Sequence, residues 1–259
     1  MGNMIDLSVW QYLYLIAGIG FASLVHGAMG IGFPMVATPL IAVLMDVRLA
    51  IILTLLPTVV VNVVSILGSK NPGTALRPYL NLFFASLLGS VIGTLMLMQF
   101  DAGIFRIALA GLIVLFLGIR LFGERLSISQ NVWTTTDNKP VMMLFGFIAG
   151  ISAGTTNVMV AILIIYMFGL GLNRLQMIPI LNSCFLIGKL CQIVMLSYAG
   201  LVSLTVVQLT IPLAGVALGG LVLGRKVGER LPMASYHRIL YALLFALAVM
   251  LVVQFVIEV

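Results

Sequence analysis

Residues 25–34 form a glycine-rich break between two apolar runs, and they read Val25-His26-Gly27-Ala28-Met29-Gly30-Ile31-Gly32-Phe33-Pro34. A second break lies 126 residues further on, counted from His26 to Ser152, and reads Ser152-Ala153-Gly154-Thr155-Thr156-Asn157. Glycine gives the backbone positive-φ freedom and close approach, so both stretches are typical of sharp turns. We predict that they are the tips of helical hairpins that approach each other inside a membrane, and that the rest of the chain positions them.

The composition excludes a water-soluble fold. Of the 259 residues, 62% are hydrophobic and 8% are charged, whereas soluble domains carry roughly 25% charged residues. Residues 141–173 and 190–224 contain no Asp, Glu, Lys or Arg at all. Such long unbroken apolar runs predict an all-α polytopic membrane protein, because a membrane β-barrel shows short alternating segments instead.

The apolar runs form five elements and then the same five again. In the first half they are 9–25, 31–45, 49–67, 79–100 and 104–122, and in the second half 140–153, 157–170, 175–196, 202–223 and 236–257. One long polar stretch separates the halves. We therefore predict a first transmembrane repeat at 1–122, a cytoplasmic linker at 123–139 and a second transmembrane repeat at 140–259.

The two halves correspond residue by residue. At the same 126-residue offset, Gly20, Arg48, Gly89 and Gly93 match Gly146, Arg174, Gly215 and Gly219. After an insertion of six residues, Phe105-Arg106-Ile107 matches His237-Arg238-Ile239. A register held over about 75 residues indicates internal duplication. The GxxxG pairs at 89/93 and 215/219 predict that both of these helices pack closely against neighbours.

Charge placement predicts that the two halves are inverted. If the first two elements of each half enter and leave by one face, one side collects Lys70, Arg77, Arg120, Arg125, Lys139, Arg174, Arg225, Lys226, Arg230 and Arg238. The other side keeps Arg48 and Arg106, and parallel halves would remove this bias. Because basic loops stay in the cytoplasm, we expect both termini in the periplasm.

The net charge of +6 is then a topology signal and does not indicate nucleic acid. Residues 1–10 hold no Lys or Arg, so we expect no cleaved signal peptide.

Three elements, 31–45, 140–153 and 157–170, are too short to span a membrane. At 1.5 Å per residue they reach about 22 Å, against a hydrocarbon core of about 30 Å. We expect the first two elements of each half to form a short glycine-broken hairpin. The two hairpins would enter from opposite faces and turn at depth, as the broken helices that mark binding sites in transporters do.

The residues at the two tips suit an anion. The candidate ligands of the first tip are His26, Gly27, Gly30 and Gly32, at the start of a helix whose N–H groups and dipole favour negative charge. Those of the second tip are Ser152, Gly154, Thr155, Thr156 and Asn157, whose side chains can cap the next helix, donate to a ligand, or both. Tight turns with ordinary caps are the alternative interpretation.

Lys189 is the one charge well inside an apolar run. Intramembrane charges are functional candidates, and an anion would be a natural partner. The alternative is that the Lys189 stem extends toward the outer surface. Asn62, Asn182 and Gln192 are further candidates that either line the same cavity or hydrogen-bond across helices. No carboxylate lies inside a span, so proton coupling would have to use His26, Lys189 or the substrate.

Other chemistry has less support. Gly150-Ile151-Ser152-Ala153-Gly154 fits the G-x-S-x-G pattern, but that motif needs an α/β sheet, which leaves an intramembrane hydrolase pairing Ser152 with His26 as a remote alternative. No metal-ligand spacing and no nucleotide-binding glycine motif occurs, so we expect no metal and no cofactor. Cys184 and Cys191 lie about 10 Å apart along one helix, too far for a disulfide.

The first tip resembles the sulfite exporter TauE/SafE family. The matching residues are 27–34 followed by Ala37-Thr38-Pro39-Leu40, and in the second half Gly146-Phe147-Ile148-Ala149-Gly150 followed by Gly154. The pairs Phe105-Arg106 and His237-Arg238 are also similar. Many members carry more glycines where this chain has Phe33-Pro34 and Thr155-Thr156-Asn157.

The resemblance implies export of sulfur oxyanions or small organosulfonates, such as sulfite or a sulfoacetate-like anion, across the bacterial inner membrane. We therefore expect a secondary transporter that holds a small anion between the two tips at the midplane and works by alternating access. A passive anion channel with the same donors is the alternative. The expected partners are the anion and the lipid bilayer, and inverted-repeat transporters of this size often form homodimers.

Overall fold

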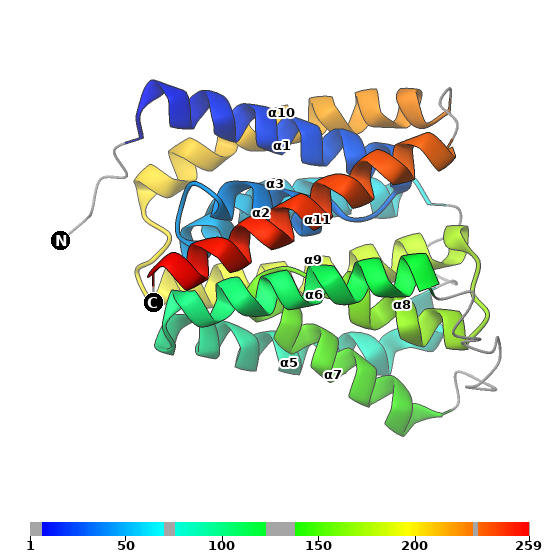
Figure 1. Cartoon of the computed structure of the whole chain (residues 1–259). Coiled ribbons are helices and arrows are strands. Elements are labelled where there is room, and N and C mark those ends of the chain that lie inside the picture. Colours follow the sequence, from blue (N-terminus) through cyan, green and yellow to red (C-terminus); the bar gives the residue numbers. More distant parts are fainter. Residues whose placement is uncertain (1–6, 70–75, 123–137, 230–232, 259) are drawn as a thin grey trace.

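The computed structural model describes residues 7–69, 76–122, 138–229 and 233–258, which form a bundle of α-helices without a strand (Figure 1). The first half contains α1 (Val9–Met29), α2 (Phe33–Ala42), α3 (Val47–Leu67), the short 3-10 turn η1 (Arg77–Tyr79), α5 (Leu80–Gln99) and α6 (Ala102–Phe122). The second half contains α7 (Lys139–Thr156), α8 (Val160–Gly169), α9 (Arg174–Tyr198), α10 (Leu204–Gly228) and α11 (Met233–Glu258). The predicted all-α fold is confirmed, while the linker residues 123–137 lie outside the described part.

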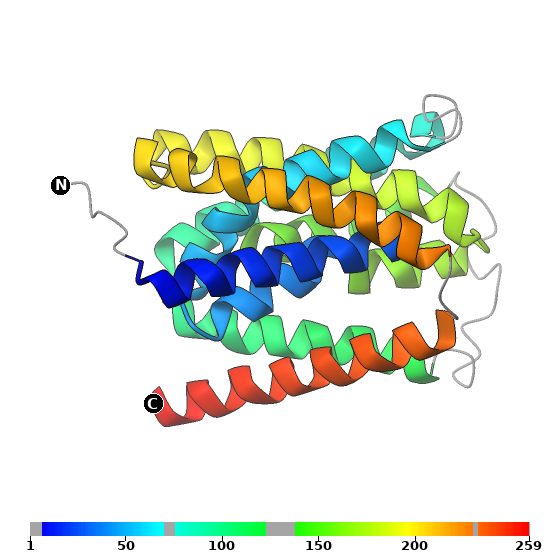
Figure 2. The same cartoon turned by 90° about the horizontal axis from the view of Figure 1, so that it is seen from above.

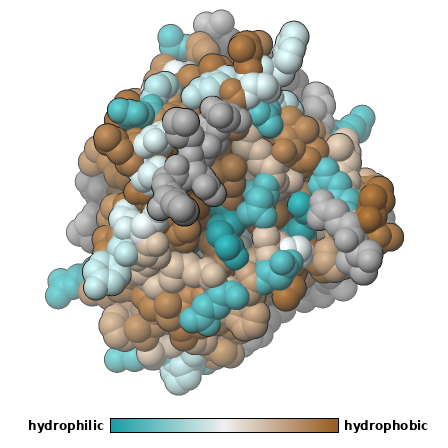
Figure 3. Space-filling view, turned by 90° about the vertical axis from the view of Figure 1, so that its left-hand side faces the viewer, coloured by the Kyte–Doolittle hydropathy of each residue, from teal (hydrophilic) through white to brown (hydrophobic). Residues whose placement is uncertain are grey.

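Seven of the described helices are long and apolar enough to cross a membrane, namely α1, α3, η1 with α5, α6, α9, α10 and α11. Their outward side chains include many large apolar residues, such as Ile16, Phe84, Leu190 and Ile211. At the end of the bundle where α1 begins, hydrophilic residues gather near the middle of the face (Figure 3). The chain is therefore a multi-pass membrane protein.

Polar side chains fix where several of these helices begin. Ser8 and Gln11 form a capping box at the start of α1, and Asn173 and Gln176 form another at the start of α9. Asp46 accepts from two backbone N–H groups at the start of α3. Such side chains satisfy N–H groups that have no partner within the helix, which matters most near lipid.

The helices pair reciprocally between the two halves. The long first arm α1 packs on α10 of the second half, and its counterpart α7 packs on α5 of the first (Figures 1 and 2). The counterparts α3 and α9 pack on each other, as do α6 and α11. In each pair, a helix of one half packs on a helix of the other half, and the counterparts of both helices pack in the same way. A two-fold relation between duplicated halves would produce such pairs.

The first arms of the two hairpins run in opposite directions, and the inverted relation of the two halves stays a prediction. In Figure 1, α1 runs from the left end of the bundle to the right, whereas α7 starts at the right and runs left. The first turn of α1 and the last turn of α11 lie at the same end. Which end faces the cytoplasm stays a prediction.

The described basic residues divide unevenly between the two ends. Arg77, Lys139, Arg174, Arg225 and Lys226 lie at helix ends on the right in Figure 1, where α3 ends and α9 begins. Arg48 and Arg106 lie near the starts of α3 and α6, at the opposite end. Lys70, Arg125 and Arg230 fall outside the described residues. The grouping predicted from the sequence is therefore present for the part of the chain that is described.

Glycine packing confirms one of the two GxxxG predictions and corrects the other. A Cβ at Gly89 would meet the backbone of Phe147 and Gly150, and one at Gly93 would meet Ile151, so this pair sits tightly on α7. Gly215 and Gly219 have nothing within 4 Å of a Cβ, so the prediction of close packing there is wrong.

The face of α10 that packs closely on α1 is formed by a different series of glycines. Gly220, Gly224 and Gly228 pack on the α1 backbone at Gly20, Leu24 and Ala28. Both series have the same four-residue spacing, and the sequence alone does not say which of them faces the partner helix.

Each hairpin joins one long arm to one half-length arm. The short arms α2 and α8 have 10 residues each, so each covers about 15 Å. The long arms α1 and α7 have 21 and 18 residues. The prediction of short elements is thus right for α2 and α8 but wrong for α7, because its helix continues through Thr155 and Thr156. Positive φ angles at Gly30, Gly32 and Asn157 make the reversals.

Candidate functional site

A polar cavity with a volume of about 610 Å³ lies where α1, α3 and α10 end and α9 begins. We call it the four-helix cavity. Its polar lining residues are His26, Ser65, Ser69, Asn173, Arg174, Gln176 and Arg225, and the backbone of Gly27, Ala28, Gly30 and Gly68 also contributes. It opens at the end of the bundle that carries most of the described basic residues.

Two arginines stand at the rim of the four-helix cavity. Arg174 donates from Nη2 to the Ala28 carbonyl at 2.8 Å and from Nε to the Met29 carbonyl at 3.2 Å. Arg225 donates from Nη2 to the Val64 carbonyl at 3.1 Å. No Asp or Glu is among the described residues that line this cavity. The arginines therefore stabilise helix C-termini and also give the cavity a positive potential.

His26 and Ser65 lie inside the cavity and are both buried. The Phe33 N–H donates to His26 Nδ1 at 3.1 Å, so Nδ1 is an acceptor. Nε2 then carries the proton and donates to Ser65 Oγ at 2.9 Å. This arrangement fixes a neutral imidazole and connects the first tip to α3.

The glycines of the first tip serve different purposes. A Cβ at Gly27 would meet the Leu221 carbonyl and Gly224 of α10, so this position is needed for helix packing. Gly30 has φ 78° and lies against Ile178. Gly27 and Gly30 are both among the residues that line the four-helix cavity.

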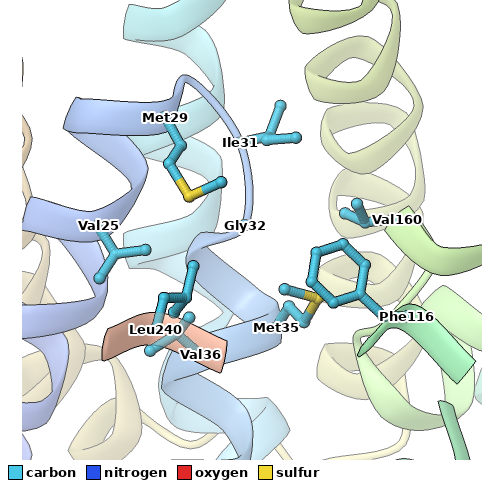
Figure 4. A pocket seen from close by; sticks show the side chains of 9 residues that line it. All are labelled: Val25, Met29, Ile31, Gly32, Met35, Val36, Phe116, Val160 and Leu240. Atoms are coloured by element: carbon cyan, nitrogen blue, oxygen red, sulfur yellow. The ribbon is translucent and has the colours of Figure 1, made fainter. Parts of the chain in front are cut away.

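The start of α2 differs from the predicted anion site. Its Phe33 N–H is taken by His26, and Pro34 has no N–H. Gly32 lies beside a small cavity of about 10 Å³ whose lining is apolar (Figure 4). The residues around it are Val25, Met29, Ile31, Met35, Val36, Phe116, Val160 and Leu240. An apolar surrounding of this kind does not suit a charged ligand.

At the second tip, Thr155 and Thr156 belong to the end of α7, so the prediction that they begin the next helix is wrong. Thr155 donates to the Ile151 carbonyl at 2.8 Å, and Thr156 donates to the Ser152 carbonyl at 2.9 Å. Ser152 donates to the Val158 carbonyl at 2.6 Å. These hydroxyls satisfy carbonyls of the turn, and none of the three lines the four-helix cavity.

Asn157 is the centre of a buried network that we call the deep cluster, comprising Thr38, Thr54, Asn157, Lys189 and Gln192. The Asn157 amide nitrogen donates to Thr38 Oγ1 at 2.9 Å and to Thr54 Oγ1 at 3.0 Å. Its Oδ1 accepts from Lys189 Nζ, which also donates to Gln192 Oε1. Gln192 in turn donates to the Gly154 carbonyl at 2.9 Å. The five residues come from α2, α3, the second tip and α9.

Lys189 is 1% exposed, so its side chain does not extend to the surface. Its described hydrogen-bond partners are neutral amide oxygens. A buried ammonium without a nearby carboxylate is costly, and this makes Lys189 a candidate for a functional residue.

The two tips contact α9 at different depths. The first tip contacts α9 through the Gly30 carbonyl, which accepts from Asn182 Nδ2 at 2.9 Å. The second contacts α9 through Lys189, about 10 Å further along the helix axis. It touches the first hairpin at Thr38, midway along α2. The predicted single pocket between the tips is therefore replaced by two polar regions at different depths.

A polar stripe on α3 runs from one region to the other. It consists of Thr54, Thr58, Asn62 and Ser65, which are spaced three or four residues apart and so lie on one helix face, and of Ser69, which follows just after the helix ends. Thr54 belongs to the deep cluster, and Ser65 and Ser69 line the four-helix cavity. Asn62 is 0% exposed, and both its amide oxygen and its amide nitrogen lack a hydrogen-bond partner.

Several residues of this arrangement were missed from the sequence. Arg174 and Arg225 were assigned to topology alone, and Thr38, Thr54 and Ser65 were not singled out. The periodicity of the α3 stripe was a signal that would have found Thr54 and Ser65. Thr38 and the arginines become visible as site residues only when α2, α9 and α10 are placed side by side.

The geometry does not favour the hydrolase alternative. Ser152 and His26 hydrogen-bond to different groups, the Val158 carbonyl and Ser65. The described residues contain no group of three His, Cys, Asp or Glu side chains that is arranged to hold a metal ion. Cys184 and Cys191 are both free.

Comparison with known families agrees with this architecture. Residues 15–251 match the sequence model of the family described as Sulfite exporter TauE/SafE. Comparison with curated proteins and with solved structures returns no match. The matched span includes both tips, the four-helix cavity and the deep cluster. The chain belongs to the sulfite exporter TauE/SafE family of membrane transporters.

Proposed function

We propose that the chain exports a small anion, either a sulfur oxyanion such as sulfite or an organosulfonate such as sulfoacetate, and that the anion first binds in the four-helix cavity. The observation that carries this proposal is the pair of guanidinium groups of Arg174 and Arg225 on a cavity without a described carboxylate. Guanidinium groups match the planar pairs of oxygens that sulfonates and sulfite present.

The proposal places the protein in a bacterial inner membrane with the four-helix cavity facing the cytoplasm and both termini in the periplasm. The basic residues around the cavity support this direction, because basic loops remain cytoplasmic. A cavity that opens to the cytoplasm receives its anion from inside the cell, as an exporter requires.

An adjacent apolar cavity supports organosulfonates as substrates. It has a volume of about 170 Å³ and is lined by Met29, Ile31, Ile164, Phe168, Arg174, Met177 and Ile178. It shares Arg174 and Ile178 with the four-helix cavity. A sulfonate group at Arg174 would leave a short carbon chain free to enter this apolar space.

A carrier fits the described side chains better than a passive channel. Beyond Ser65, the polar stripe continues through Asn62, Thr58 and Thr54, which are each 0% exposed. These three side chains are closed to solvent in the present conformation, so transfer of an anion past them requires a conformational change.

Flux into proteoliposomes tests the proposal. Sulfite, sulfate, sulfoacetate and taurine are offered in turn, with unlabelled anion inside the vesicles to drive exchange. We expect saturable, exchange-stimulated uptake of sulfite or sulfoacetate and no single-channel current. Unsaturable flux with channel currents would show a channel, and no flux of any of these anions would contradict the proposed function.

A further inference from the structure

The deep cluster is separate from the four-helix cavity, since none of its five residues lines that cavity. Ser65 on the cavity wall and Thr54 in the deep cluster are about 16 Å apart along α3 at 1.5 Å per residue. The deep cluster and the four-helix cavity are therefore two distinct polar regions, and the role of the deep cluster is not explained by uptake of an anion into the cavity.

Lys189 is incompletely satisfied in the deep cluster. An ammonium group has three N–H donors, and its described partners are two amide oxygens, those of Asn157 and Gln192. Neither partner is charged, and the described residues contribute no ion pair to it. One donor and the whole positive charge remain available to a ligand.

The α3 stripe supplies a polar surface between the two regions. Asn62 lies between Ser65 and Thr58 on this stripe, with one unpartnered donor group and one unpartnered acceptor in a fully buried position. A buried amide without partners costs free energy. It is accounted for if a polar solute passes it during transport.

We propose that the deep cluster is a second anion subsite, in which Lys189 holds the substrate anion after it leaves the four-helix cavity and passes along the α3 stripe. The proposal rests on the proposed function and extends it from uptake to translocation. The ligand class is a small singly or doubly charged oxyanion that replaces its water shell with the Lys189 ammonium group and the hydroxyl of Thr38.

Asn157→Asp gives the sharpest test, because it places a carboxylate where the substrate anion would bind. The side chain keeps its size, and the Thr38 hydroxyl can donate to the new oxygen. We expect saturable uptake of sulfite or sulfoacetate to fall by about tenfold or more, since the internal anion competes with the substrate for Lys189. The thermal melting temperature in detergent should stay the same or rise, because the buried ammonium gains a counter-ion.

The control is Asn138→Asp, the same chemical change at the exposed cap of α7, which should leave uptake unchanged. Lys189→Met serves as the second variant. It should lower uptake by a similar factor while equilibrium binding of sulfite at the four-helix cavity stays within about threefold of the parent protein.

The outcomes separate the two proposals. If the parent protein transports the anion and both Asn157→Asp and Lys189→Met transport it equally well, the deep subsite is wrong and the proposed function stands. If uptake and melting temperature fall together in Asn157→Asp, the cluster is structural and the subsite is again wrong. If the parent protein binds and carries no sulfur anion, the proposed function fails and the subsite falls with it.

Discussion

Asn62 and Lys189 are buried polar residues without the partners that burial normally requires. Both amide atoms of Asn62 are unpartnered, and Lys189 has only neutral described acceptors. Native proteins satisfy most buried polar groups, and the exceptions call for an explanation. In a transporter, an unpartnered polar group can bind the solute transiently as it passes. Replacing such a group should then raise stability and lower transport.

Asn62→Leu should therefore make the protein more stable and less active. Removing an unpartnered buried amide relieves a penalty of about 1–3 kcal/mol, and leucine has a similar size. Uptake in proteoliposomes should fall, because the α3 stripe loses its central polar group. Thermal unfolding in detergent and initial uptake rates measure the two effects on the same preparation.

The control is Thr94→Val on α5, where a buried hydroxyl is also without a partner but does not belong to the α3 stripe. It should leave uptake unchanged. An Asn62→Leu protein that is less stable, or that transports as well as the parent, would show that Asn62 has a structural role only.

At the level of single residues, the sequence predicted which polar side chains lie inside the bundle better than what they contact. Lys189, Asn157 and Gln192 were identified because a polar residue in an apolar run is conspicuous, and the three form one cluster. The hydroxyls of Thr155 and Thr156 were expected to cap the next helix, to donate to a ligand, or both. Instead, they donate hydrogen bonds to carbonyls one turn earlier in α7. Such local hydrogen bonds cannot be predicted from composition.

The two hairpins are the elements on which the account depends. Their existence and their short arms were predictable from the glycine breaks and the lengths of the apolar runs. The end of α7 was placed several residues too early, because Thr-Thr-Asn is as typical of a helix start as of a turn. Asn157 adopts φ 65° and ends α7, a role that asparagine shares with glycine.

The glycine pairs of α5 and α10 give a matched test of helix packing. Gly89→Ala should lower stability by more than about 1 kcal/mol, because the new methyl group would meet the backbone of Phe147 and Gly150. Gly215→Ala, its counterpart in the repeat, should be neutral or raise stability by about 0.5–1 kcal/mol through helix propensity. Chemical unfolding in detergent measures both. Equal effects of the two substitutions would contradict the observed difference in packing.

At the scale of the whole molecule, the reciprocal pairing of α1 with α10 and of α7 with α5 is the main result that the sequence did not supply. The repeat itself could be read from the matching residues. Which helices touch could not, because apolar helix faces in lipid do not identify their partners. The charge bias was predictable, since it depends only on the order of the spans.

Orientation can be measured with single cysteines in a protein that lacks Cys184 and Cys191. Position 198 is the last residue of α9 and position 229 follows the end of α10, so Tyr198→Cys and Glu229→Cys place the two thiols at opposite ends of the bundle. We expect an impermeant maleimide added to intact cells to label Tyr198→Cys and to leave Glu229→Cys unlabelled until the membrane is opened. The reverse pattern would put the four-helix cavity on the outer side and contradict export from it.

The most direct test of the central claim is the Michaelis constant for sulfite uptake in Arg225→Gln, with Arg48→Gln as the matched control. Arg225 donates to the Val64 carbonyl beside the four-helix cavity, and Arg48 donates in the same way to the Phe100 carbonyl at the other end. We expect the constant to rise by about tenfold in Arg225→Gln and to stay unchanged in Arg48→Gln, because only the first lines the anion site. Equal constants in the two variants and the parent protein would contradict the assignment of the four-helix cavity as the place where the anion binds.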